Sequence, residues 1–435
     1  MSRTRSPKIV VIGAASSSFS GLLADLVSAE EIDGAELALV DIDAEGLDIM
    51  TRLGRRMAKD WGRKTTVAGS ADRSDVIAGA DFVLTTIAVG GMTTWKQDEA
   101  IPRKHGYYGH SVDTVGPGGL FRGLRLIPPL IDVCRDVERL APAAWVINYS
   151  NPMAAVCKAI ADATRVNVIG LCTAGYLPKQ IARFLEIDEQ RIEVVSAGVN
   201  HWVWAMKIIV DGEDITPAFH DKMRKMHAGK YYGSSVELLD LFGAWPMPGA
   251  NHVAEFFPYF YGPGDDGRDA PDKYGFRSGH DFDAELKKAV EQRARLAAQA
   301  RGEEPLGHKP AESAREAVQI LISIWTGKRS RHYANLANTG LVDNLPAGTF
   351  VEVPVIADSA GVRGIHVGPL PEAVAGLVAA RCVYNDLLAR AAVIKSKHVA
   401  LQCLMADPLT TSIPKARACV EEMFAAQAEF LPGYG

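Results

Sequence analysis

The stretch KIVVIGAASSS, residues 8–18, combines a continuous apolar run with a turn of small residues. A short run of this kind is typical of a strand that is buried on both faces of a parallel sheet. Similar runs follow along the chain, and stretches with helical spacing separate them. The further predicted strands are 36–43, 81–89, 144–150 and 166–172. This alternation predicts an α/β fold with a doubly wound parallel sheet.

The pattern changes after residue 190. Residues 192–214 predict long antiparallel strands with an Asp-Gly turn, and the Gly/Pro-rich residues 263–281 predict a loop. Pro128-Pro129 should kink or divide the long helix that precedes the fourth strand. Further helices are predicted at 216–228, 234–243, 283–301, 309–326 and 371–405. We therefore predict a Rossmann-type domain, residues 1–195, and an α+β domain, residues 196–435, similar to the C-terminal domain of lactate dehydrogenase.

The composition narrows the class of protein. The chain has 435 residues and a net charge of −5, with 48% hydrophobic and 23% charged residues, as in ordinary globular proteins. The sequence contains no basic stripe that would indicate a nucleic-acid partner. It also contains no apolar run of about 18 residues that would indicate a membrane span. Six cysteines without paired spacing predict free thiols in a reducing cytoplasm. The N-terminal residues predict a first strand and not a signal peptide.

The turn after the first strand is suited to a dinucleotide. Its small residues let backbone N–H groups approach a pyrophosphate. The N-terminus of the next helix, which is the positive end of the helix dipole, also favours the negatively charged phosphates. Asp41, at the end of the second strand, can accept a hydrogen bond from a ribose hydroxyl. Its negative charge favours NAD over NADP, because it would repel a 2′-phosphate. Only one glycine of the G-x-G-x-x-G pattern is present, so an α/β protein with such a turn and no cofactor is the alternative. The predicted cofactor contacts here are Gly13, Ala14, Ser16 and Asp41.

Cys172 and His201 each follow a predicted strand. Ligands of open parallel sheets bind at the carboxyl ends of the strands, so a thiolate and an imidazole there suggest a divalent metal beside the dinucleotide. Two protein ligands leave positions for substrate and water, as in a catalytic metal site. The alternatives are an inert core thiol and a satisfied core histidine between Trp202 and Trp204.

Several distinctive motifs are distributed along nearly the whole chain. They are KIVVIGAASSS with VDID, SVDTVGPGGLFRGLR (111–125), VINYSNPM (146–153), IGLC (169–172), GVNHW (198–202), PGANHVAEFFP (248–258) and NTGLVDNLP (338–346). On these motifs the sequence resembles glycoside hydrolase family 4, the NAD- and divalent-metal-dependent glycosidases. Within that family it is most similar to the α-glucuronidase and α-galacturonidase branch, whose substrates carry no phosphate.

The resemblance implies a redox route to glycoside cleavage in place of the two-carboxylate scheme. In such enzymes NAD⁺ takes hydride from sugar C3, a base removes the C2 proton, and a metal, usually Mn²⁺, stabilises the enediolate. The C1–O bond then breaks by elimination, water adds, and NADH returns the hydride. The resemblance also implies Cys172 and His201 as the metal ligands and a homodimer or homotetramer. A thiolate ligand makes reducing conditions important.

The resemblance assigns further roles near the metal. Asn151 is expected to contact the sugar hydroxyls and the cofactor, although an Asn before Pro also suits a turn. Asn200 is a candidate substrate contact. Asp113, a candidate catalytic residue, and Thr114 lie in a loop expected near nicotinamide and sugar; a helix cap or turn is the alternative for Asp113. Arg122 is expected to bind a substrate oxygen or carboxylate, with a structural arginine as the alternative.

The segment NHVAEFFPYFY, residues 251–261, holds the candidate bases. His252 is the first candidate for the base at C2, with a core histidine as the alternative. Tyr259 is a second candidate base, and Tyr261 is a further one, although both suit aromatic packing. Glu255 is a candidate substrate contact.

Two departures from the expected pattern reduce the charge of the sugar pocket. Thr173 stands where related enzymes often carry His, and Gly-Ala-Asn-His, residues 249–252, stands where they often carry Gly-Asp-Arg-His. A neutral sugar is therefore an alternative to a uronide. Two other functions stay open: a simple NAD-dependent hydroxyacid dehydrogenase, and a non-catalytic NAD-binding homologue, which the change at 173 favours.

Overall fold

A computed structural model describes residues 5–16, 19–109, 113–172, 177–227, 232–263, 269–270, 276, 279–307 and 312–434. Thr173 and most of the loop predicted at 263–281 lie outside this part of the chain. Among the described residues, no helix is both long enough and apolar enough to span a lipid bilayer.

The N-terminal half forms a parallel sheet in the order β3-β2-β1-β4-β5-β6. Its strands are β1 (Lys8–Ile12), β2 (Glu36–Val40), β3 (Thr66–Ser70), β4 (Phe82–Thr85), β5 (Trp145–Asn148) and β6 (Asn167–Gly170). The predicted doubly wound fold is confirmed. Strand β3 was not predicted, because it is an edge strand with only one buried residue and therefore has no apolar run.

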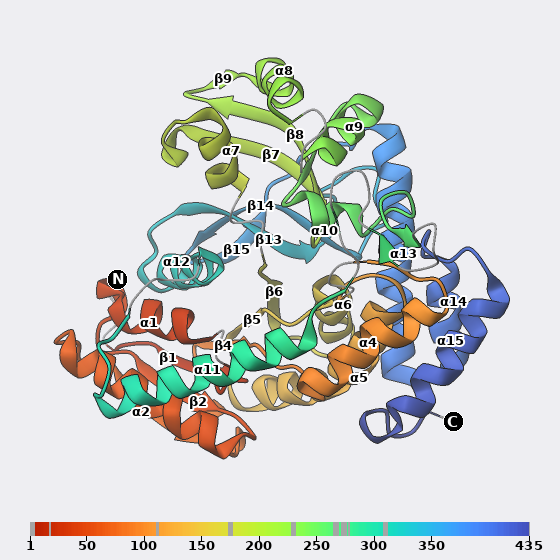
Figure 1. Ribbon diagram of the computed structural model, residues 1–435. Coiled ribbons are helices and arrows are strands. Elements are labelled where there is room, and N and C mark those ends of the chain that lie inside the picture. The colour runs from red at the N-terminus through yellow and green to blue at the C-terminus, as the bar shows by residue number, and fades with distance from the viewer. Residues whose placement is uncertain are drawn as a thin grey trace.

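Helices cover both faces of this sheet (Figure 1). They are α1 (Ser20–Ser28), α2 (Ala44–Asp60), α3 (Ser74–Ile77), α4 (Gly91–Lys104), α5 (Gly116–Leu140) and α6 (Met153–Ala163). Ile9 and Val11 of β1 belong to one core cluster, while Val10 belongs to the other, as the two-residue period of a strand requires. Helix α5 runs through Pro128-Pro129 without a break, so the predicted division is wrong. Its long buried face packs along its whole length and compensates for the lost hydrogen bonds.

The same sheet continues into the C-terminal half in the order β10-β8-β7-β14-β13-β6. These strands are β7 (Ile192–Val199), β8 (Trp202–Val210), β9 (Glu213–Asp214), β10 (Trp245–Met247), β13 (Ser330–Ala337), β14 (Phe350–Asp358) and β15 (Gly361–Gly364), with a separate ladder of β11 (Gly262–Pro263) and β12 (Asp269–Ala270). The predicted antiparallel pair within 192–214 is confirmed. The pattern predicted no strands in 330–364, because buried polar residues such as Asn335 and Glu352 interrupt the apolar periodicity.

The remaining helices surround these strands. They are α7 (Leu177–Leu185), α8 (Thr216–His227), α9 (Gly233–Phe242), α10 (Ala250–Ala254), α11 (Phe282–Arg301), α12 (Glu312–Thr326), α13 (Glu372–Ile394), α14 (Lys397–Met405) and α15 (Ile413–Ala426). Short 3-10 turns lie at Glu30–Ile32, Glu189–Arg191 and Ala428–Phe430. The predicted helical tail at 371–405 is two helices, because Lys395 has a left-handed backbone and Ser396 caps α14. Helix α11 crosses the nucleotide-binding half in front of α2 (Figure 1).

Strands β6 and β7 meet at their carboxyl ends. Three antiparallel pairings separate them, through β13 and β14, so β7 runs opposite to β6. Each contacts the intervening hairpin through a single residue pair near its last residues, Gly170 with Asn335 and Gly198 with Glu352. We expected both strands to end on one edge of a parallel sheet, and this is corrected. The two strands approach the same point from opposite directions (Figure 1).

Candidate active site

Cys172 and His201 come together where β6 and β7 end. The Sγ atom of Cys172 lies 3.0 Å from Nε2 of His201. Cys172 is half-buried, whereas the other five cysteines, all unpaired, are buried. These two residues are 29 positions apart in the sequence, and the structure brings them into contact as predicted.

His201 occupies the second position of the tight turn between β7 and β8. Its φ of 67° lies in the left-handed region, which is uncommon for a residue with a side chain. Such a conformation costs on the order of 1–3 kcal/mol and is found most often at functional sites. The imidazole is buried. Burial lowers its pKa, but the contact with Cys172 and the nearby charge of Asp113 outweigh this and raise the pKa well above its usual value.

Asp113 lies on the other side of His201. Its Oδ1 is 3.8 Å from Nδ1 of His201, and its Oδ2 accepts a hydrogen bond from Nδ2 of Asn151 at 3.1 Å. Arg122, in the first turns of α5, donates from Nε to the backbone oxygen of Asn151. Burial raises the pKa of the Asp113 carboxyl, but the charges of His201 and Arg122 more than compensate and lower it. Asp113 is therefore held as a carboxylate.

His252 lies beside His201 and is part-exposed. Its ring lies 4.6 Å from the ring of His201, and its Nδ1 is 4.0 Å from Oε2 of the buried Glu255. Short helix α10 supplies His252, and Glu255 directly follows that helix. Tyr259 is 73% exposed, and its ring lies against the rings of Phe257 and Phe260. Of the candidate bases, the structure thus brings His252 to the cluster.

Thr114 and Asn200 line a small cavity behind Asp113. Its other lining residues are Pro152, Met153, Ala154, Arg381 and Asn385. A Cβ on Gly119 would lie 2.5 Å from the carbonyl carbon of Thr114, so only glycine allows α5 to begin against this segment. Arg381 was not predicted from the sequence; it comes from α13 and donates to Asp407 at 2.9 Å.

A buried carboxylate that the sequence analysis missed lies under the β7–β8 turn. Oε2 of Glu352 accepts from Nδ2 of Asn335 at 2.8 Å and from Nδ2 of Asn200 at 3.3 Å. Burial raises the pKa of Glu352. A signal was present, because Glu352 stands between Val351 and Val353 in an otherwise apolar stretch.

The predicted cofactor turn is held by its own hydrogen bonds. The N–H groups of Gly13 and Ala14 both donate to the oxygen of Val40, and Ala15 N–H donates to Oδ2 of Asp41 at 2.8 Å. Gly13 has a φ of 94°, and a Cβ there would lie 2.4 Å from the oxygen of Thr86. The N–H groups of Gly13 and Ala14 are thus not free to meet a pyrophosphate.

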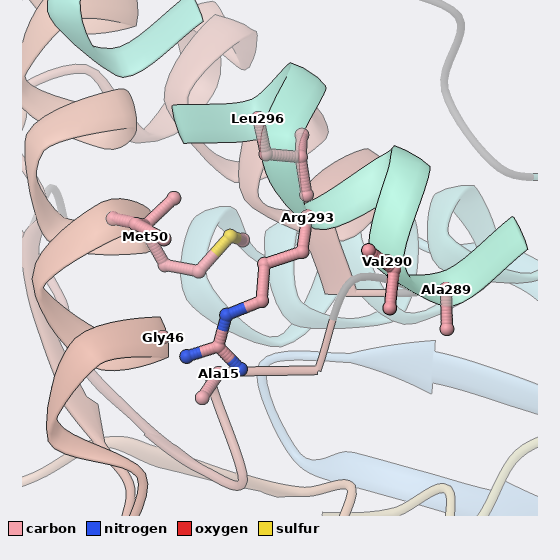
Figure 2. A pocket seen from close by; sticks show the side chains of 8 residues that line it. Ala15, Gly46, Met50, Ala289, Val290, Arg293 and Leu296 are labelled. Carbon is pink, nitrogen blue, oxygen red and sulfur yellow. The ribbon is translucent and has the colours of Figure 1, made fainter. Parts of the chain in front are cut away.

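A pocket of about 240 Å³ opens beside this turn. Its walls are Ala15, Gly46, Ile49, Met50, Ala289, Val290, Arg293 and Leu296, from the turn, α2 and α11. Figure 2 shows Arg293 extending from α11 toward Gly46 and Ala15 across the pocket. Its guanidinium bonds Asp43 and Glu45. The pocket has apolar walls and one charged end.

The comparisons with known proteins agree with one another. The family model for family 4 glycosyl hydrolases matches residues 8–187, and the model for the C-terminal domain of that family matches residues 196–410. The chain belongs to glycosyl hydrolase family 4. The family that the motifs indicated is thereby confirmed, and this protein is a glycosidase.

The relatives of this family 4 glycosidase are named for different sugar substrates. An alpha-galactosidase of Bacillus subtilis (strain 168) is 30% identical, with 98% of this chain and 99% of that protein covered. An alpha-galacturonidase of Thermoanaerobacter italicus is 26% identical, with 98% of each covered. A solved structure of a 6-phospho-alpha-glucosidase from gut microorganisms, in complex with NAD and Mn²⁺, has a TM-score of 0.85 at 21% identity, with 98% of this chain and 99% of that one covered. Family membership alone therefore does not specify the sugar.

The donor atoms of the glycosidase fit a divalent metal. Ligand bonds of about 2.0–2.3 Å place a nitrogen and a sulfur about 3–3.6 Å apart when they share one cation, and the Cys172–His201 distance lies at the lower end of this range. Oδ1 of Asp113 and Oδ1 of Asn151 are buried without a hydrogen-bond partner among the described residues. In that part of the chain, no three His, Cys, Asp or Glu side chains form a closed metal cage. The site thus suits an open metal with positions for other ligands.

Proposed function

We propose that this glycosidase cleaves a non-phosphorylated α-glycoside or uronide by transient oxidation at C3, with NAD and a divalent metal such as Mn²⁺. The observation that carries this proposal is the 3.0 Å contact between Cys172 and His201 beside the part-buried carboxylate of Asp113. The relatives include an alpha-galactosidase and an alpha-galacturonidase, whose names give sugars without phosphate, as well as a 6-phospho-beta-glucosidase; the departure from a phosphorylated substrate rests on the sequence motifs and on the first two names. The metal would be held by Cys172 and His201.

When bound, NAD⁺ supplies a hydride acceptor for C3 and the metal supplies Lewis acidity for the oxygens on C2 and C3. The pocket between α2 and α11 supports the cofactor part of the proposal, because its apolar walls suit a flat base and it adjoins the turn. Asp41 would accept from the ribose once its bond to Ala15 is exchanged.

The residues around the metal position have distinct tasks in this proposal. Asn151 binds a sugar hydroxyl through its Oδ1, while Asp113 holds the amide end of the same side chain. Arg122 fixes the backbone of Asn151. Asn200, with Oδ1 turned away from Glu352, binds a second sugar hydroxyl.

His252 is the proposed base that removes the C2 proton. Its imidazole lies beside His201 and its side chain is 28% exposed, so substrate can reach it. Buried Glu255, whose Oε2 lies 4.0 Å from Nδ1 of His252, favours the imidazolium that forms after proton removal. Burial of the cluster excludes water from the acidified carbon.

A substrate panel tests the proposal. Aryl α- and β-glycosides and the corresponding uronides are assayed with NAD⁺, Mn²⁺ and a thiol reductant in D₂O. We expect hydrolysis of a sugar without phosphate, deuterium at C2 of the product and no net NADH. Net NADH would instead indicate the dehydrogenase, and NAD binding without turnover would indicate the non-catalytic homologue. Activity confined to 6-phospho-sugars would contradict the substrate assignment.

Assembly and location complete the proposal. A homodimer or homotetramer follows from the family resemblance and can be measured by light scattering. Unpaired, mostly buried cysteines support a reducing compartment such as the cytoplasm. We expect thiol oxidants to inactivate the enzyme reversibly through Cys172, its half-buried cysteine.

A further inference from the structure

Strands β6 and β7, whose ends carry Cys172 and His201, do not touch each other along their length. The hairpin of β13 and β14 lies between them, and four residues form one row across the four strands. Gly170 pairs with Asn335, Asn335 with Glu352, and Glu352 with Gly198. The two central members of this row, Asn335 and Glu352, are polar and almost completely buried.

Side chains connect the same row. Nδ2 of Asn335 donates to Oε2 of Glu352 at 2.8 Å and approaches the backbone oxygen of Gly170 at 3.4 Å. Nδ2 of Asn200 donates to the same Oε2 at 3.3 Å. The row therefore connects the end of β6, two residues before Cys172, to the turn that contains His201.

Burying the carboxyl group of Glu352 is unfavourable for the free energy of folding. Glu352 is 2% exposed, and its neighbours Val351 and Val353 are fully buried. A carboxyl group removed from water costs several kcal/mol unless it is well paired, and an apolar residue would suit the position at least as well. The position thus favours a role for the carboxyl beyond packing, and its place under the metal-binding turn indicates which role.

We propose that Glu352 and Asn335 are positioning residues that set the separation of Cys172 and His201 and orient Asn200. The amide nitrogen of Asn200 is held by Glu352, its Oδ1 is buried without a hydrogen-bond partner among the described residues, and the residue lines the cavity shared with Thr114. The same contact steadies the strained turn at His201. This inference rests on the proposed metal function. Residues that hydrogen-bond to the metal ligands or their neighbours, without touching the metal, typically change the affinity for the metal 10–100-fold when they are mutated.

The test measures binding of Mn²⁺ alone, from the EPR signal of the free ion, to the full-length protein. Glu352→Met removes both acceptor oxygens at similar length, and we expect Mn²⁺ to bind about 10–100-fold more weakly. Glu352→Gln keeps one acceptor oxygen, and we expect it to restore affinity to within about threefold. NAD affinity, measured by calorimetry, should stay unchanged in both variants, because β1, which leads into the nucleotide turn, lies four strands away from β13 in the sheet order.

A matched control separates positioning from stability. Glu316→Gln weakens another buried contact of β13, the 2.8 Å bond to Nδ1 of His332. We expect it to lower the melting temperature without changing Mn²⁺ affinity. If Glu352→Met does not fold, Asn335→Ala takes its place, since it removes the donor to both Glu352 and Gly170.

Wild-type Mn²⁺ affinity in folded Glu352→Met, or in Asn335→Ala where that variant takes its place, would overturn the positioning role. Failure of the wild-type protein to bind Mn²⁺ would instead contradict the proposed metal function. The two failures are therefore distinguishable.

Discussion

The nucleotide turn and the metal cluster are built in opposite ways. At the turn, neighbouring segments of one βαβ unit hold each other through backbone groups, such as the bonds from Gly13 and Ala14 to Val40. At the cluster, side chains from five distant segments converge, from Asp113 to His252, and buried polar contacts hold them. The first arrangement should tolerate side-chain changes other than at Gly13, whereas the second should fail when one side chain changes.

The largest effect is expected at the cluster. In Cys172→Ser the hydroxyl is a much weaker metal ligand than a thiolate, so Mn²⁺ affinity and turnover should fall by more than about 100-fold. Free-Mn²⁺ EPR and hydrolysis rates measure this. Cys419→Ala, at a buried thiol in α15, is the matched control and should keep both. Unchanged Mn²⁺ binding in Cys172→Ser would remove the metal assignment.

The second-largest effect is expected when one charge is removed from the cluster. Asp113→Asn keeps the size of the side chain but removes the charge beside His201. We expect kcat to fall about 10–100-fold, because hydrogen bonds and charges in a buried site contribute a few kcal/mol to the transition state. Asp211→Asn, at an exposed ion pair with Arg191, is the control. Equal kcat in the wild type and Asp113→Asn would show that the carboxylate has no part in catalysis.

A smaller effect is expected at the turn. Asp41→Asn removes the charge that disfavours a 2′-phosphate but leaves an acceptor for Ala15. The preference for NAD over NADP should fall about tenfold, corresponding to about 1.4 kcal/mol. Calorimetry with both cofactors measures this, and Mn²⁺ affinity should be the same as in the wild type. A variant that lost Mn²⁺ as well would show that the two regions are coupled.

The smallest effect is expected at the rim of the pocket. Arg293→Met removes the ion pairs with Asp43 and Glu45, which are partly exposed. Such pairs contribute less than about 1 kcal/mol, so unfolding should change little and NAD affinity only a few-fold. Arg301→Met, at an exposed pair on the same helix, is the control and should leave NAD affinity unchanged. Loss of NAD binding by more than tenfold in Arg293→Met would make this arginine a principal cofactor contact.

The contribution of this ion pair depends on pH in a defined direction. The hydrogen bond from Arg293, followed by that from the Gly46 N–H, lowers the pKa of Asp43. The stabilisation is therefore present above the ordinary pKa of an aspartate, about 4, and is lost as the pH falls through the lowered value. The difference in melting temperature between the wild type and Arg293→Met should disappear on acidification and stay constant from pH 6 to 8. A difference that grew on acidification would contradict the assignment.

The parallel sheet was predictable because each of its inner strands is a short apolar run, as in KIVVI and FVLT. The site residues Cys172 and His201 were predictable as a pair because each follows a predicted strand and each lies in a family motif. Strand β3 and the β13–β14 hairpin were not predictable, because an exposed edge and buried polar residues both mask the periodicity. Arg381 and Arg293 could not be linked to the site, since long side chains on helices look the same whether they face solvent or a pocket.

The sequence by itself determined the α/β class, the turn proposed to bind the nucleotide and the two residues proposed to bind the metal. These features depend on local patterns, which neighbouring residues specify. Only the tertiary structure decided that β6 and β7 meet end to end, and that Glu352 and Asn335 lie beneath the pair. Pairing between strands far apart in the chain is set by packing of the whole sheet, and no local pattern encodes which distant residue lies opposite another.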